Sequence, residues 1–242
     1  RVSFPSRPRC PTAPGFCLVS QIYPVTQQSQ SNRIALLINI ETFNTSLYKC
    51  RAAKDEKVMQ SLLQTLGYEV VRCGDITAKV TFKKFSEHPK LALTDSVFVT
   101  LVCYGGTGTE EFEIDQIFQH LNSKNCPALK DKPKIVIIHA CRGVNSVKGP
   151  QTHNEKDFII FHSNMIWFCL LADTGSYTHE TYGSAFIQHI CEAVKKHCLR
   201  DDIEEIFRTV SLASGIYGIH KYRDTLTKRF YVFQSECYRF LM

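Results

Sequence analysis

The sequence has little of what marks a membrane protein or a disordered one. Its longest apolar run, MIWFCLLA at residues 165–172, is far shorter than the roughly 20 residues that span a bilayer. Only 9 of the 242 residues are proline, and a charged share of 21% stands beside a hydrophobic share of 44%. This balance excludes the disordered and collagen-like classes and predicts a folded globule with a substantial apolar core.

Paired or regularly spaced cysteines are also missing. The chain has 11 cysteines, an odd number, and no two of them form a C-x-x-C pair or another spacing typical of disulfide or metal frameworks. Cys73, Cys103 and Cys191 fall inside apolar patterns, where a buried free cysteine behaves as a small hydrophobe. The pattern predicts reduced thiols that serve packing, a cytoplasmic location, and neither a metal nor another cofactor.

Concentrated charge of one sign is absent too. The net charge of +6 is spread along the chain, and no basic tract marks an arm that would bind nucleic acid. The charge therefore favours solubility, and we expect neither a nucleic acid nor a membrane as a partner.

The N-terminal residues differ from the rest of the chain. Residues 1–20 hold four of the nine prolines and show no helical or strand period, so we expect an irregular tail. Because the sequence begins at Arg1 and not at methionine, we expect a fragment whose missing N-terminal region carries targeting or interaction modules. From residue 21 onward we expect a single domain with two regions, 21–149 and 150–242.

Apolar runs of strand length alternate with helical spacing through this domain. Gly67 is expected to end the first long helix. Strands that are apolar on both faces and separated by helices are typical of an α/β fold with a mostly parallel sheet covered on both sides. The predicted strands are 33–40, 69–73, 95–106, 133–141, 157–163 and 228–234, and the predicted helices are 53–68, 81–89, 112–123, 183–197 and 202–214.

Two chemically interesting residues end predicted strands. Reactive groups of open α/β sheets lie at the carboxyl ends of strands, where both Tyr104 and Cys141 fall, so the two can share a site. Arg142 and Gly143 follow Cys141, and a thiol near positive charge or a base becomes a nucleophile. Taken alone, a cysteine in an apolar strand is most often a packing residue.

The residues around Cys141 make the signal specific. HACRG at 139–143 resembles the caspase signature Q-A-C-[RQG]-G. Segments such as RIALLINIETF, LLQTLGYEVV, LNSKNCPALKDKPKIVIIHACRG and TLTKRFYVF are similar to caspase segments in the same order, over roughly 21–234. IYPV and DIEEIFRTV resemble the inflammatory branch. The resemblance implies a six-stranded, mostly parallel α/β sheet with helices on both faces, in which 21–149 is the large-subunit region and 150–242 the small-subunit region.

The resemblance also implies a chemistry that this chain departs from. Active caspases cut after aspartate with a cysteine nucleophile and the histidine of a Ser-His-Gly motif. The nucleophile position is Cys141, and the histidine position is Tyr104 in VCYGG, followed by Gly105, whose backbone would help to hold an oxyanion. A phenol with an ordinary pKa near 10 is a poor acid or base at neutral pH.

The implied substrate pocket departs from the family as well. Caspases hold the substrate aspartate with two arginines and a glutamine. The glutamine position is His139, the first arginine position is Lys49 with Arg51 as an alternative alignment, and the second is Thr178. Lysine offers a point charge in place of a bidentate grip and threonine offers none, so we expect the aspartate to be held badly.

Another histidine could rescue the chemistry. On a strand, His139 would share a face with Cys141, and His179 belongs to a loop that approaches the cleft in the family. Against both stands the fact that most histidines in a chain of this size are surface or core residues. The linker after Cys141 holds no aspartate before Asp157, so we expect the single chain to persist uncut.

Three functional hypotheses follow from the resemblance. The favoured one is an impaired or inactive protease that regulates apoptotic or inflammatory signalling by pairing with an active caspase or with itself, through a final strand at 227–234. The alternative is an active cysteine endopeptidase that acts on protein substrates with altered catalytic partners. The third is a decayed gene product, to which the insert at 163–175 lends some weight.

Overall fold

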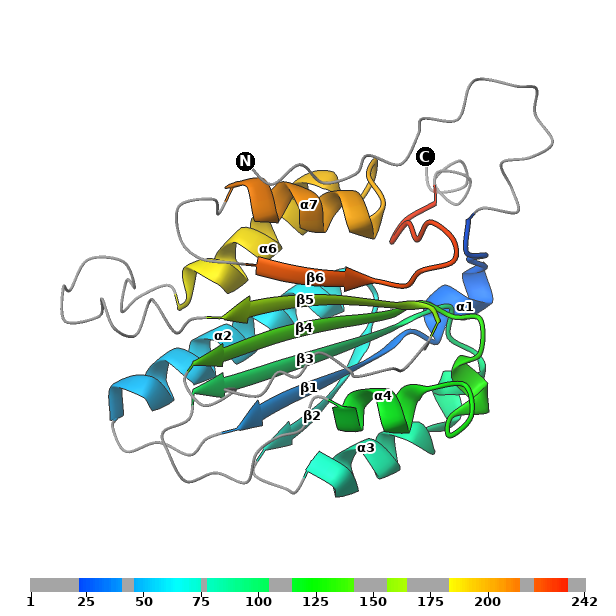
Figure 1. Ribbon diagram of the computed structural model, residues 1–242, viewed down its shortest axis with the longest axis horizontal. Helices are drawn as coiled ribbons and strands as arrows, with labels where there is room; N and C mark the ends of the chain where they lie inside the picture. The colour runs from blue at the N-terminus through cyan, green and yellow to red at the C-terminus, as the bar shows by residue number, and fades with distance from the viewer. Residues whose placement is uncertain are drawn as a thin grey trace.

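The computed structural model describes residues 22–40, 46–74, 78–104, 115–141, 156–164, 183–213 and 220–234. The predicted tail at 1–20 and most of the linker that follows Cys141 lie outside these ranges. The described residues form three layers, with a twisted sheet between two layers of helices (Figure 1).

The sheet has six strands in the order β2-β1-β3-β4-β5-β6. The first five strands run parallel and β6 pairs antiparallel with β5, so the predicted six-stranded, mostly parallel sheet is confirmed. The central strands are mostly apolar because helices cover both of their faces. The bounds are β1 Ile34–Ile40, β2 Glu69–Gly74, β3 Val97–Tyr104, β4 Lys134–Cys141, β5 Phe158–Asn164 and β6 His220–Asp224.

Alternate strand residues feed two separate cores. On β4, Ile135 and Ile137 pack toward one layer, and Val136 and Ile138 pack toward the other. The first layer is α2 (Ser46–Thr65), α6 (Ala185–His197) and α7 (Ile203–Ala213); the second is α3 (Ala78–Ser86) and α4 (Asp115–Leu121). Short helical turns complete the described elements: α1 (Gln27–Ser31), η2 (Pro89–Ala92) and η3 (Pro127–Leu129).

The end of α2 confirms the helix stop predicted at Gly67. Gly67 has a φ of 85°, which a side chain would disfavour. Its N–H donates to Gln64 O at 3.0 Å and the N–H of Tyr68 donates to Leu63 O at 2.9 Å. This pair of bonds is a Schellman motif, which satisfies carbonyls of the last helical turn and directs the chain into β2.

The last predicted strand, 228–234, is wrong. The sixth strand is β6, and within 228–234 only Arg229 forms an isolated bridge, with Ile22. Phe230 and Val232 are fully buried in the core shared with α6 and α7. Their carbonyls accept hydrogen bonds from Ile203 N–H and the Arg33 guanidinium, so no neighbouring strand is needed. A segment rich in β-prone aromatic residues therefore serves packing, and a partner cannot use it as a free sheet edge.

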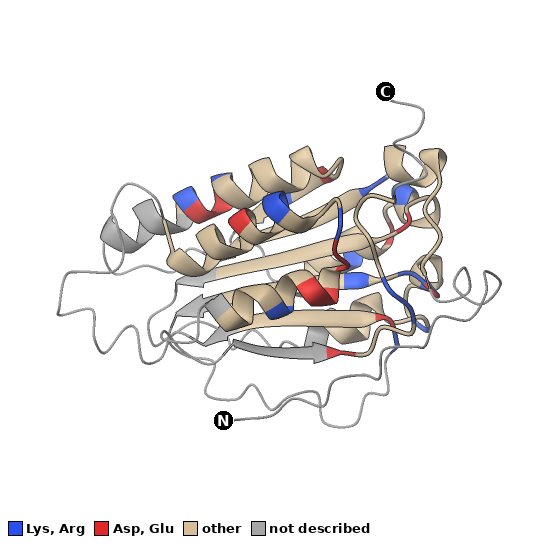
Figure 2. Cartoon of the chain, turned by 90° about the horizontal axis from the view of Figure 1, so that it is seen from above, with Lys and Arg blue, Asp and Glu red and all other residues tan. Residues whose placement is uncertain are grey.

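Charges of both signs lie interspersed on the helices and at the strand ends (Figure 2), while the interiors of β1, β3, β4 and β5 carry none. Inside the protein, Tyr23 Oη donates to Asp157 Oδ1 at 2.5 Å, and Thr227 Oγ1 donates to the same oxygen at 2.6 Å. Burial, with the Asp157 carboxylate beside it, raises the pKa of Tyr23 above its ordinary value. The contact joins residues from both predicted regions of the chain.

Candidate active site

The two strand ends singled out in the sequence are neighbours. β3 ends at Tyr104 and β4 at Cys141, and in the parallel register of these strands Tyr104 is the Cα partner of Cys141. The structure describes the backbone at both positions. Two adjacent parallel strands thus bring Cys141 and Tyr104, the predicted nucleophile and histidine positions, to the same end of the sheet, as expected for open α/β folds.

His139, two residues before Cys141, is fully buried on the face covered by α2 and α6. Its Nε2 lies 3.7 Å from Asp55 Oδ2. Its ring stacks on Phe186 with the centroids 5.3 Å apart and the planes at 21°. The imidazole is therefore held between a carboxylate from α2 and an aromatic ring from α6.

Asp55 is the residue that sequence reasoning missed. Its side chain is fully buried, and Oδ1 accepts a hydrogen bond from the Ser184 N–H at 2.7 Å. A Cβ on Gly183 would lie 2.3 Å from the same oxygen, and Gly183 has a φ of 81°, so only glycine fits there. The signal was in the spacing, because Asp55 shares a 3–4 residue helical period with Met59 and Leu62, which are core residues.

The next residue of α2 makes a second set of polar contacts at the same edge. Asn39 Nδ2, at the end of β1, donates to Glu56 Oε2 at 2.8 Å. Arg72 of β2 donates from Nε to Glu56 Oε1 at 2.6 Å. Together with Asp55, Glu56 ties α2 to the carboxyl ends of the strands and fixes the wall of the site.

The other predicted site residues have different outcomes. Lys49 and the alternative Arg51 lie in α2 upstream of Asp55, where the structure describes the backbone. Gly105 and Thr178 lie outside the described residues, as does His179.

Among the described residues no group of three or more His, Cys, Asp or Glu side chains is placed to hold a metal ion. Within the same residues no helix is both long and apolar enough to cross a membrane.

The sequence model of the peptidase C14 family, described as the caspase domain, matches residues 32–230. The chain belongs to the caspase family. Caspase b of Danio rerio is 33% identical over 248 residues, covering 88% of this chain and 59% of the relative. Caspase-1 of Rattus norvegicus is 32% identical over 257 residues, covering 88% of this chain and 62% of the relative.

Solved caspase structures agree with the fold. Caspase-1 from Spodoptera frugiperda superimposes with a TM-score of 0.68 at 18% identity, over 93% of this chain and 98% of the other. The structure described as pro-sf-caspase-1 gives 0.68 at 19% identity, over 87% and 97%. Against its curated relatives this caspase-family chain spans about three fifths of their length. The inflammatory resemblance is in keeping with the caspase-1 relatives.

Proposed function

We propose that this caspase-family chain is an impaired protease that acts as a regulator of an active caspase. The observation that carries the proposal is the register of β3 and β4, which pairs Tyr104 with the nucleophile position Cys141. A phenol with an ordinary pKa near 10 neither activates a thiol nor protonates a leaving amine efficiently at neutral pH. The base is therefore missing at the place where the family supplies it.

The environment of His139 supports the same proposal. If His139 stands at the pocket glutamine position, a substrate aspartate has to approach a side chain that already lies 3.7 Å from the Asp55 carboxylate. Two carboxylates at one buried imidazole repel each other. Lys49 would supply a point charge and Thr178 none, so the pocket has lost most of its grip on an anionic side chain.

One observation favours the alternative, an active cysteine endopeptidase. A histidine that lies beside a buried aspartate resembles the arrangement that orients the base in Cys-His-Asp and Ser-His-Asp sites. His139 has such an aspartate in Asp55, and it is two residues from Cys141. In that case His139, and not Tyr104, would be the base.

A turnover assay separates the two. The purified chain is incubated with aspartyl reporter peptides and with a mixed peptide library, beside Cys141→Ala and His139→Gln variants. We expect the wild type to match Cys141→Ala on every substrate. Turnover that disappears in Cys141→Ala would overturn the proposal, and its loss in His139→Gln as well would establish the alternative.

The burial of the first aspartate after Cys141 supports the proposal that the chain is not cut and activated as a protease. Asp157, the first aspartate after Cys141, is only 2% exposed, and its carboxylate accepts hydrogen bonds from Tyr23 and Thr227. A protease cannot seat this side chain without local unfolding. We propose that the chain stays uncut at Asp157 when an active caspase-1 is added, which mass spectrometry of the intact protein would check.

Pairing with a caspase, or with a second copy, would use β6, which pairs only with β5 among the described residues, and not 227–234. The Thr225 N–H donates to Phe158 O, so along the antiparallel register the N–H of Arg223 also faces β5 and that of Tyr222 faces outward. Proline at an outward position removes the donor and leaves the sheet intact. We propose that Tyr222→Pro abolishes association in sedimentation with and without caspase-1, while Tyr222→Ala preserves it. A cytoplasmic location belongs to the same proposal.

A further inference from the structure

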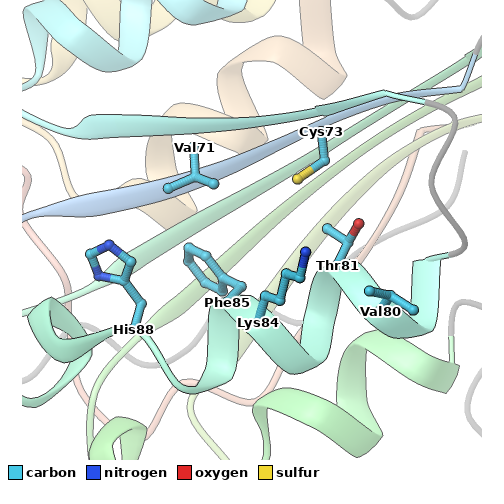
Figure 3. A pocket seen from close by; sticks show the side chains of 7 residues that line it. All are labelled: Val71, Cys73, Val80, Thr81, Lys84, Phe85 and His88. Carbon is cyan, nitrogen blue, oxygen red and sulfur yellow. The ribbon is translucent and has the colours of Figure 1, made fainter.

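A groove lies between β2, the terminal strand of the sheet, and the helix α3 (Figure 3). The strand β1 separates β2 from β3 and β4. It encloses about 200 Å³ between β2 and α3. The space is comparable to that of one or two large apolar side chains. The lining residues are Val71, Cys73, Val80, Thr81, Lys84, Phe85 and His88.

The lining is apolar with a cationic rim. Val71, Val80 and Phe85 supply apolar walls, and Val80 is 43% exposed although it is a valine. Lys84 extends from α3 toward β2 in Figure 3. None of the lining residues is acidic, and none of the described ion pairs involves Lys84. The groove therefore complements a ligand that is apolar and carries a negative charge.

The groove lies beside an open row of backbone hydrogen-bonding groups. β2 is the terminal strand of the sheet and pairs only with β1 among the described residues. The Glu69 N–H donates to Arg33 O at 2.9 Å, so the backbone groups of Glu69 face β1. Since these groups alternate along a strand, those of Val70 and Arg72 point outward. An outward row of donors and acceptors is a template for one more strand.

We propose that this edge is a docking site for an extended peptide segment of a partner protein, which adds a strand to β2. Alternate side chains of the added strand face α3, so one of them, apolar, enters the groove and an acidic one two residues away meets Lys84. The site is independent of the catalytic edge, because β2 is two strands from β3 and its groove contains none of the candidate active-site residues.

The charge and the hydrogen-bond row each select a feature of the ligand. Lys84 favours an acidic residue over a basic one, while the outward groups of Val70 and Arg72 favour a backbone that is extended and has free N–H groups. A small apolar molecule would fill the groove but make no hydrogen bonds with the backbone of β2. An acidic, apolar peptide in extended form uses both.

The test measures fluorescence anisotropy of a labelled peptide with the sequence Thr-Leu-Thr-Glu-Thr-Leu-Thr against the whole chain. A second probe has Lys in place of Glu, and a third has N-methylated backbone amides. The protein variants are Lys84→Glu and Val80→Asp, with Lys83→Glu as the matched control, an exposed lysine on the same helix that does not line the groove. All three positions are exposed, so the fold is retained.

We expect the acidic probe to bind at least ten-fold more tightly than the basic and N-methylated probes. Lys84→Glu should weaken the acidic probe ten-fold and strengthen the basic one, and Val80→Asp should weaken both, while Lys83→Glu leaves all affinities within two-fold. Equal binding of the N-methylated probe would overturn strand addition. No binding of the acidic probe at 1 mM, or equal loss in Lys83→Glu and Lys84→Glu, would overturn the site.

Discussion

The amino ends and the carboxyl ends of the parallel strands hold their buried charges in different ways. We call these two rims of the sheet its amino-end edge and its carboxyl-end edge. At the amino-end edge, Arg33 Nε donates to both oxygens of Asp95, at 3.0 and 3.1 Å, and its other nitrogens donate to Leu66 O and Val232 O. At the carboxyl-end edge, His139 Nε2 stands 3.7 Å from Asp55 Oδ2. The first edge is fixed by hydrogen bonds that surround one guanidinium, whereas at the second the Asp55 carboxylate accepts a hydrogen bond from the Ser184 N–H at 2.7 Å and makes a longer contact with His139.

Removing a charged side chain should therefore have different consequences for stability at the two edges. Removing one partner of a buried, fully hydrogen-bonded ion pair strongly destabilises the fold, because the other charge is left unpaired in the core. The carboxyl-end edge carries the candidate site, where Tyr104 pairs with Cys141 and where, in the proposed assignment, Tyr104 and His139 stand at positions that differ from active caspases. We therefore call the amino-end edge the anchoring edge and the carboxyl-end edge, where the candidate site lies, the reactive edge.

The largest effect should come from breaking the anchoring edge. We expect Arg33→Met to lower the free energy of unfolding by about 3–5 kcal/mol, because Asp95 then remains buried without its cation. Urea denaturation followed by circular dichroism measures the change. A loss below about 1 kcal/mol would show that the two edges are equally tolerant.

A smaller loss is expected at the reactive edge. Asp55→Ala removes the acceptor of the Ser184 N–H and should cost about 1–3 kcal/mol. Asp55→Asn keeps an oxygen at that position, so it should lose less than half as much in the same denaturation experiment. If Asp55→Asn were as damaging as Asp55→Ala, the contact with His139 would dominate, and the edge would be anchored by charge after all.

The buried Cys191 thiol, in the core between the two edges, predicts that the free energy of unfolding depends on pH. Burial raises the pKa of the Cys191 thiol to about 12, so in the folded state the thiol stays protonated when its unfolded counterpart ionises near pH 9. This stability is fully present below about pH 9 and is lost as the pH rises. We expect about 1 kcal/mol less unfolding free energy at pH 10 than at pH 8, with a reduced slope in Cys191→Ala. An unchanged slope in that variant would exclude the thiol as its source.

The smallest effect is expected from restoring the family's histidine alone. Tyr104→His supplies a base next to Cys141 in the register, but the lost grip on a substrate aspartate still costs on the order of 2–5 kcal/mol. Hydrolysis of aspartyl reporters should stay at the Cys141→Ala background. Full activity from this one change would show that Lys49, His139 and Thr178 are not the pocket.

Much of the fold could be predicted from local patterns. β1, β3 and β4 are mostly apolar because they are central strands, and Gly67 marks a helix end through its backbone freedom. The pairing of Tyr104 with Cys141 followed from the carboxyl ends of parallel strands meeting at one edge. These features depend on residues close together in the chain or on a general rule of the fold.

The misses depend on tertiary context. β6 has the sequence HKYRD, with no apolar alternation, because it is an edge strand; its pairing partner β5 supplies the apolar residues. Phe230 and Val232 looked like strand residues and are core residues of an irregular segment. Asp55 was not singled out in the sequence, and its close approach to Gly183 joins residues more than a hundred positions apart. The groove beside β2 has no counterpart in any local pattern.

The contact of Tyr23 and Thr227 with Asp157 limits when this domain can fold as the ribosome synthesises the chain. The three residues are separated by 134 and 70 positions, so the contact is complete only after the residues through Thr227 have emerged. Until then Asp157 lacks both of its donors and Tyr23 lacks its acceptor. Folding that depends on such distant contacts is slow, and this contact cannot be complete before the segment that contains Thr227 has been synthesised.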